Sequence, residues 1–249
     1  MSRIIYYIII AVCGMAVGSF LSILIYRLPG KISIKAFSFC PDCNTKIRFF
    51  DNIPVISFII LKGRCRNCRR RISAFYPIAE ILTSALYVIS FYFYGLSFNL
   101  LLSLLLISGL IAVSFIDIKY ELIPNAVVIP LTAAGLLINI LMMPQRWWII
   151  LSFASGAFIF MFLINLIYPA GMGMGDVKLG LMAGSFLVEK IIPGLFIGFL
   201  AGSIYGLIML LIKKKKLKQT IPFGPFISFG CIVALFFGDK IINWYLKFI

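Results

Sequence analysis

Residues 98–117 read FNLLLSLLLISGLIAVSFID. The first nineteen have no charged side chain, and Asp117 follows them. An α-helix rises about 1.5 Å per residue, so about twenty apolar residues cross the roughly 30 Å hydrocarbon core of a bilayer. Of the 249 residues, 62% are hydrophobic and 12% are charged, and the mean hydropathy is +1.09. We therefore predict an all-α polytopic membrane protein.

Similar apolar runs recur along the chain and predict about eight transmembrane helices. They lie at 4–26, 75–94, 98–116, 123–143, 147–168, 177–188, 191–212 and 221–246. The first run is longer than the roughly 7 to 15 residues of a signal-peptide core, and no small-residue cleavage site follows it. We expect it to remain as a membrane helix.

The net charge of +15 is concentrated in two segments. Eleven of the 23 Lys and Arg residues lie within 27–71 and five more within 213–218, which does not resemble a soluble nucleic-acid-binding domain. The positive-inside rule places both segments on the cytoplasmic side, and six predicted crossings separate them. We expect both termini outside and no nucleic-acid partner. The basic run 213–218 fits an anchor for anionic lipid, without a catalytic role.

Two carboxylates stand out in a chain with eight acidic residues and no histidine. Asp117 closes one apolar run, and Asp176 lies in the sequence Gly-Met-Gly-Asp-Val-Lys at 173–178. An Asp at bilayer depth costs roughly 2.5 to 3.5 kcal/mol on insertion scales, so it is a candidate functional group. The predicted topology puts both acids near the cytoplasmic boundary. That they touch is a hypothesis, because helix packing decides lateral neighbours.

Two carboxylates in contact share one proton and titrate as a pair. The ionised member takes a proton from water while the protonated member hydrogen-bonds the scissile carbonyl, which is aspartic-protease chemistry. The lack of histidine removes the Ser-His-Asp, Cys-His and His-Glu-x-x-His mechanisms. A Ser–Lys dyad with Lys178 stays open. Alternatively, Asp117 and Glu121 flank Lys119 as ordinary interfacial residues.

The glycines before Asp176 have two interpretations. Gly171 and Gly175 form a small-xxx-small pair typical of close helix packing. Glycines also let a peptide backbone approach the carboxylate closely. We take Gly173, Gly175 and Lys178 as supporting residues of the site.

A second motif consists of two Cys-x-x-Cys pairs in the large basic loop, Cys40 with Cys43 and Cys65 with Cys68. Four thiolates suit a structural tetrahedral metal site, and zinc is favoured. Disulfides are the alternative, but a reducing cytosol argues against them. The loop has little apolar core, so metal binding is expected to fold it. The other two cysteines, Cys13 and Cys231, lie in apolar helices and are expected to be packing residues.

Taken together, these motifs resemble the type IV prepilin peptidase family, an eight-span group of intramembrane aspartic peptidases. The matching stretches are 18–22, 26–29, 52–54, 76–80, 123–125, 173–178 and 222–226, together with both cysteine pairs and Asp117. They follow the family's order over nearly the whole chain. The Gly-x-Gly-Asp element alone also occurs in presenilin-like proteases, so the ensemble carries the resemblance.

The resemblance implies that Asp117 and Asp176 cleave the basic leader of prepilins or pseudopilins after a Gly, at the cytoplasmic face of the bacterial inner membrane. It also implies methylation of the new N-terminal residue with S-adenosylmethionine. Residues 1–96, with the cysteine-rich loop 27–73, would form the methyltransferase part, and 97–249 the six-helix peptidase part. Ser22 departs from the family, which often has Asn there.

Glu80 is a further candidate, because it either holds the incoming amine or pairs with a loop cation such as Arg70 or Arg71. These three residues are our candidates for cofactor binding. Glu80 can equally be a helix-end acid. The stretch 222–226 is either a helix-entry turn or a wall of the active-site cleft.

Two functions of other classes remain open from the sequence. One is a proton- or ion-coupled transporter that uses Asp117, Asp176 and Glu80 as a relay, although no internal repeat is visible. The other is a zinc-bearing membrane scaffold without chemistry.

Overall fold

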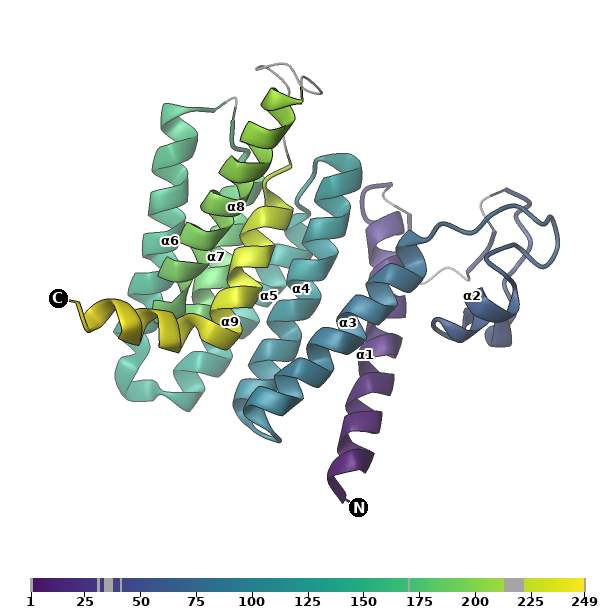
Figure 1. Ribbon diagram of the computed structural model, residues 1–249, viewed down its shortest axis with the longest axis horizontal. Coiled ribbons are helices and arrows are strands. Elements are labelled where there is room, and N and C mark those ends of the chain that lie inside the picture. The colour runs from purple at the N-terminus through teal and green to yellow at the C-terminus, as the bar shows by residue number, and fades with distance from the viewer. Residues whose placement is uncertain are drawn as a thin grey trace. The chain divides into compact units, whose positions relative to one another are not determined.

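The computed structural model describes residues 2–30, 32–33, 38–40, 42–169, 171–212 and 222–248. The chain divides into two compact units, Met1–Ser97 and Phe98–Ile249. Within the described residues the regular structure is helical, apart from two isolated β-bridges in the cysteine-bearing loop (Figure 1). This confirms the predicted all-α class. The basic run 213–218 lies outside the described residues.

Two long helices form the framework of the first unit, α1 (Ser2–Arg27) and α3 (Phe75–Tyr94). They lie side by side and run in opposite directions (Figure 1). A Cβ at Gly18 would lie 2.6 Å from Glu80 Cα, so the two backbones meet where α1 has no side chain. Between these helices, the cysteine-bearing loop includes the 3₁₀ helix η1 (Phe49–Asn52) and the short helix α2 (Ile56–Ile60).

Six α-helices make up most of the described part of the second unit. They are α4 (Phe98–Tyr120), α5 (Asn125–Met142), α6 (Trp147–Ile167), α7 (Met174–Leu187), α8 (Ile191–Leu211) and α9 (Gly224–Leu246). The shortest of them, α7, packs against the other five. Its residues Val177, Leu179 and Met182 are fully buried. Because protein surrounds α7, it does not need the length of a lipid-facing helix.

Length and composition alone select seven candidate membrane spans, one of which is the 38-residue stretch Met174–Leu211. At about 1.5 Å per residue this stretch would be about 57 Å long, nearly twice the hydrocarbon core. The chain instead turns at η3 (Val188–Lys190), where Val188 has a φ of 51°. The described chain thus has seven apolar helices of at least 18 residues and the shorter, buried α7, and the protein is a multi-pass membrane protein.

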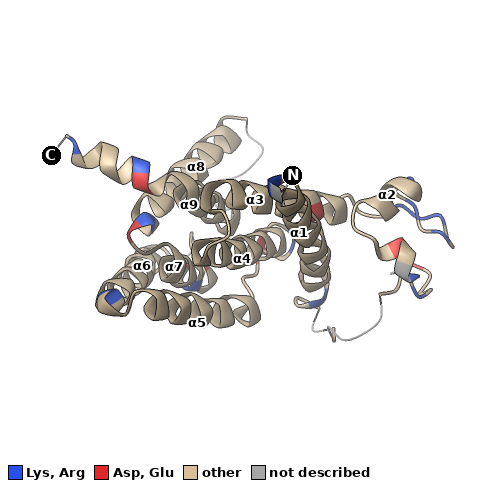
Figure 2. Ribbon diagram, turned by 90° about the horizontal axis from the view of Figure 1, so that it is seen from below, with Lys and Arg blue, Asp and Glu red and all other residues tan. Residues whose placement is uncertain are grey.

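The surface of these helices is largely uncharged. Figure 2 shows Lys and Arg (blue) and Asp and Glu (red) mainly at helix ends and on the cysteine-bearing loop, with other residues (tan) between them. Many large apolar side chains are exposed along the helices, for example Ile159 on α6 at 54% and Phe196 on α8 at 68%. Such exposure is costly in water and ordinary in lipid.

Close packing of α8 against α9 depends on Gly230. A Cβ there would lie 2.2 Å from Gly194 O and 2.5 Å from Gly198 N, so the Gly230→Ala substitution must push the helices apart. We expect it to lower the free energy of unfolding by about 1 to 3 kcal/mol, measured by thermal unfolding of purified protein. Gly156→Ala is the matched control, because a Cβ there meets nothing within 4 Å. Equal effects of the two substitutions would contradict this packing.

Candidate active site and candidate metal centre

Asp117 lies in the last turn of α4 and is only 5% exposed. Its Oδ2 accepts a hydrogen bond from the backbone N–H of Gly224, the first residue of α9, at 2.9 Å. A Cβ at Gly224 would lie 2.7 Å from the same oxygen, so only glycine fits there. The stretch 222–226 is therefore a helix entry that also contacts the acid. Asp117 differs from its neighbours Lys119 and Glu121, since both of them are exposed and Asp117 is buried.

Asp176 belongs to the first turn of α7 and is 7% exposed. Its Oδ2 accepts a hydrogen bond from the N–H of Gly173, the N-cap residue, at 3.0 Å. Its Oδ1 is buried and has no hydrogen-bond partner among the described residues. One oxygen thus fixes the carboxylate on its own helix, and the other is left for a further group.

The two acids lie on neighbouring helices of the second unit. The helices α4, α7 and α9 pack against one another, and the carboxylates lie close enough for the charge of Asp117 to act on Asp176. Each accepts an N–H at the start of a helix, where the aligned backbone dipoles favour negative charge. Two buried acids on neighbouring helices are candidates for a proton-sharing pair.

The supporting residues have separate roles. A Cβ at Gly175 would lie 2.8 Å from Ile123 Cβ, so this glycine lets α7 approach the segment after α4. A Cβ at Gly173 would meet its nearest neighbour, Asp176 Oδ2, at 3.7 Å, an ordinary contact. The Lys178 Nζ donates to Asn125 Oδ1 at 3.0 Å, and its hydrogen-bond partner is thus an amide rather than a serine.

The small-xxx-small interpretation of Gly171 and Gly175 does not match the structure. Gly171 lies before α7, in a turn where its N–H donates to Tyr168 O at 3.0 Å. A Cβ on Gly171 would lie 2.1 Å from the Tyr168 ring, so the turn requires this glycine. Only Gly175 is on the helix, and the pair does not form one helix face.

Both Cys-x-x-Cys pairs in the first unit fold into the same kind of turn. The backbone N–H of Asn44 donates to Cys40 O at 2.9 Å, and that of Arg69 donates to Cys65 O at 3.1 Å. Asn44 and Arg69 each follow the second cysteine of a pair, and both have positive φ, 53° and 60°. The repetition means that two similar knuckles present their sulfurs to one point.

The four sulfurs of Cys40, Cys43, Cys65 and Cys68 lie within 4.8 Å of one another. Cys40 Sγ and Cys68 Sγ are 3.8 Å apart. Four sulfurs at about 2.3 Å from a central ion in a tetrahedron are also about 3.8 Å apart, so the cluster fits a metal ion. All four are free thiols in the described chain, which does not support the disulfide alternative. The remaining cysteines differ, since Cys231 is fully buried and Cys13 is exposed on α1.

Charge in this cluster also favours a cation. Hydrogen bonds of the Thr45 side chain and backbone lower the pKa of the Cys43 thiol to about 6. A backbone hydrogen bond of Arg70 lowers the pKa of Cys68, but burial and the neighbouring sulfurs outweigh it and raise that pKa to about 12. Close sulfurs therefore resist joint ionisation, and a bound dication removes this repulsion.

Glu80 is buried on α3 with 7% exposure, and its Oε2 accepts a hydrogen bond from Val55 N at 2.8 Å. Val55 has φ 60° and ψ −49°, which is strained for a β-branched residue. No sequence signal marks Val55, because the preceding Pro54 restricts only the residue before it. The carboxylate of Glu80 also lies within hydrogen-bonding reach of the Ser19 side chain.

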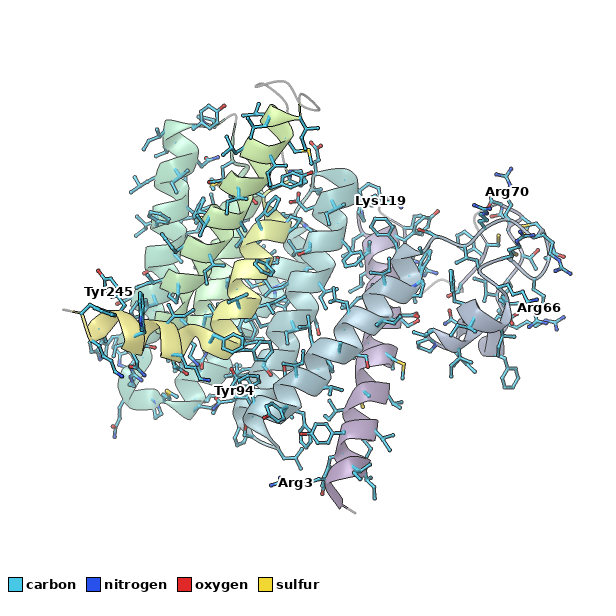
Figure 3. All side chains as sticks on the ribbon, viewed as in Figure 1. Arg3, Arg66, Arg70, Tyr94, Lys119 and Tyr245 are labelled. Atoms are coloured by element: carbon cyan, nitrogen blue, oxygen red, sulfur yellow. The ribbon has the colours of Figure 1, made fainter. Side chains whose placement is uncertain are left out.

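The three candidates for cofactor binding are not brought together. The Arg70 side chain is 72% exposed and lies 3.7 Å from Asp42. Figure 3 shows Arg66 and Arg70 on the outside of the cysteine-bearing loop. Among the described residues, no ion pair joins Glu80 to Arg70 or Arg71.

Comparison with known proteins gives consistent matches along both units. The bacterial peptidase A24 N-terminal domain model matches residues 12–94, and the type IV leader peptidase family model matches residues 104–209. A protein of Bacillus subtilis (strain 168) is 36% identical over 96% of this chain and 97% of its own length. The chain belongs to the type IV leader peptidase family. A Legionella pneumophila protein is 34% identical over 97% of this chain and 95% of its own length. Both relatives carry the name prepilin leader peptidase/N-methyltransferase. No solved structure was found to match. Family membership was predicted from the motifs and is confirmed.

The four-sulfur cluster predicts one bound metal ion per chain. Cys40→Ser or Cys68→Ser removes one of four ligands, so each variant is expected to lose most of the metal that elemental mass spectrometry finds in the purified wild type. Cys13→Ser is the matched control and is expected to keep the ion, since Cys13 lies apart from the cluster. Purified wild-type protein that contains no metal after expression in metal-supplemented medium would contradict this prediction.

Proposed function

We propose that this protein is an intramembrane aspartic endopeptidase that removes the basic leader of type IV prepilins or pseudopilins and then methylates the new N-terminal residue. The observation that carries the peptidase part is that two buried carboxylates lie on packed helices of one unit, Asp117 at the end of α4 and Asp176 at the start of α7, and that each accepts an N–H at a helix start. Membership of the type IV leader peptidase family supports the substrate class. The names of the relatives support both activities.

In the proposed mechanism the pair holds one proton. The ionised carboxylate takes a proton from water, whose oxygen bonds to the scissile carbonyl carbon, while the protonated carboxyl group donates a hydrogen bond to the carbonyl oxygen. Collapse of the tetrahedral intermediate breaks the C–N bond, and the leaving amine receives the proton. The Gly224 N–H holds Asp117 in place, and the unpartnered Oδ1 of Asp176 is available to the substrate.

The remaining parts of the proposal concern the first unit and the side of the membrane on which the two sites lie. The four cysteines would bind zinc as a structural ion that stabilises the loop, because tetrahedral thiolate ligation is typical of such sites. S-adenosylmethionine would supply the methyl group for the new amine, but we assign it no residues. The positive-inside rule supports a cytoplasmic position for the cysteine loop and the aspartate pair, with both termini outside.

A mass-spectrometric assay tests the proposed activities. Purified protein is incubated with a model prepilin with and without S-adenosylmethionine. We expect loss of the leader in both reactions and one added methyl group only with the cofactor. Asp117→Asn and Asp176→Asn each remove a catalytic carboxylate and are expected to slow cleavage by about 10³-fold or more. Asp239→Asn is the matched control, since Asp239 is exposed and pairs with Lys190.

Full cleavage by either catalytic variant would contradict the aspartic mechanism. A wild type that cleaves nothing but carries protons or ions across proteoliposome membranes, with the flux lost in Asp117→Asn, would favour the transporter instead.

Gly224→Ala tests whether the N-terminus of α9 positions Asp117. The new methyl group would overlap Asp117 Oδ2, so the carboxylate must move. A displacement near 1 Å in a catalytic group costs about 10²-fold in rate, and we expect a loss of kcat on that scale with little change in KM. Gly156→Ala is the control, with open space around its Cβ. Equal kcat values for the two variants would show that α9 does not position the acid.

A further inference from the structure

The short helix α2 exposes a row of apolar side chains outside the two long helices of the first unit. Ile56, Ile59 and Ile60 are 52%, 67% and 68% exposed, and Phe50 in the adjoining η1 is 76% exposed. Within the described residues, no side chain of α2 is buried. In a loop with several cations, this much apolar exposure indicates a surface that contacts something apolar.

Cations lie next to Ile60, the last residue of α2, around one hollow of about 530 Å³. The hollow is lined by Ile60, Leu61 and Cys65 and by the cations Lys62, Arg64, Arg66 and Arg69. Arg66 is paired with Asp51 at 2.6 Å. Among the described residues, no ion pair to an acid engages the other three cations. Apart from Cys65, one of the four clustered cysteines, the lining is thus apolar on one side and positive on the other.

The depth of α2 is set by the contact between Val55 and Glu80. Val55, the N-cap residue of α2, donates its N–H to Glu80 Oε2 at 2.8 Å. Glu80 lies five residues after Phe75, the start of α3, which places it about 7.5 Å along the helix axis. The start of α2 is therefore level with the first turns of a membrane-spanning helix. Interfacial helices bury their apolar face roughly 5 to 10 Å into the headgroup and acyl boundary.

We propose that α2 is an interfacial anchor that inserts Ile56, Ile59 and Ile60 into the bilayer surface, and that the adjoining cationic hollow binds the headgroup of an anionic phospholipid. The charge balance fits this ligand. Residues 42–73 contain eight Lys or Arg and two Asp, so positive charge remains in excess even when four thiolates hold a divalent ion. A basic prepilin leader would be repelled from the same surface. The proposal goes beyond the peptidase and methyltransferase activities and does not depend on them.

Amide hydrogen exchange of the full-length protein in nanodiscs tests this inference. One set of discs contains phosphatidylcholine alone and the other phosphatidylcholine with phosphatidylglycerol at 7:3. We expect the amides of residues 56–64 to exchange more slowly in the anionic discs, because each cation at an anionic surface strengthens binding by about fivefold. Raised salt is expected to remove the difference.

Two variants separate the apolar contribution from the charged one. In Lys62→Gln/Arg64→Gln/Arg69→Gln we expect no difference between the two lipid compositions. In Ile59→Ser/Ile60→Ser we expect faster exchange in both. Lys240→Gln/Lys247→Gln removes two exposed cations near the end of α9 and is the matched control, which is expected to behave as the wild type. All variants are compared at equal metal content and equal thermal stability, which shows that the loop is folded.

Exchange of residues 56–64 at the same rate in both kinds of wild-type disc would overturn the proposal. A difference in exchange rate between the two kinds of disc that persists in Lys62→Gln/Arg64→Gln/Arg69→Gln would also overturn it. Protection that persists in detergent at high salt would show that protein covers the patch, and would overturn it as well.

Discussion

The structure depends on accommodating two carboxylates inside an apolar protein. Burial of each carries a penalty that only hydrogen bonds and favourable dipoles offset. Asp117 obtains an N–H from the start of α9, and Asp176 obtains one from the cap of its own helix. Both acids use N–H groups at helix N-termini, and α4, α7 and α9 pack against one another. The central position of α7 and the requirement for glycine at Gly224 follow from that constraint.

Much of the fold could be predicted because membrane insertion depends on local hydropathy. The helices were placed within a few residues of their observed bounds. The start of α7 differs from the prediction, because the helix was expected to begin at residue 177 and begins at Met174. It starts earlier because Gly173 caps it and Asp176 accepts the Gly173 N–H. The acid is therefore part of the helix rather than of the loop before it.

The packing of the helices beside one another was not predictable, because hydropathy does not show which helices are neighbours. Sequence indicated that Asp117 and Asp176 share a depth, but the contact of Asp117 with Gly224, 107 residues away, requires the packed bundle. In the first unit, the cysteine spacing predicted a metal cluster, since the ligand types and their number are local features. The hydrogen bond between Val55 and Glu80 depends on a strained backbone conformation of Val55, which no sequence motif indicates. The exposed isoleucines of α2 could not be distinguished by sequence from a small core.

The central claim is that two distant carboxylates meet at one site, and cysteine cross-linking tests it most directly. In a Cys13→Ser/Cys231→Ser background that keeps the four metal-binding cysteines, Asp117→Cys/Asp176→Cys is treated in membranes with the shortest bifunctional thiol reagent. The account predicts an intramolecular link between the two positions, found by peptide mass mapping, and no such link in Asp117→Cys/Asp239→Cys. Two thiols at 117 and 176 that are each alkylated by a monofunctional reagent, yet are never linked, would contradict it.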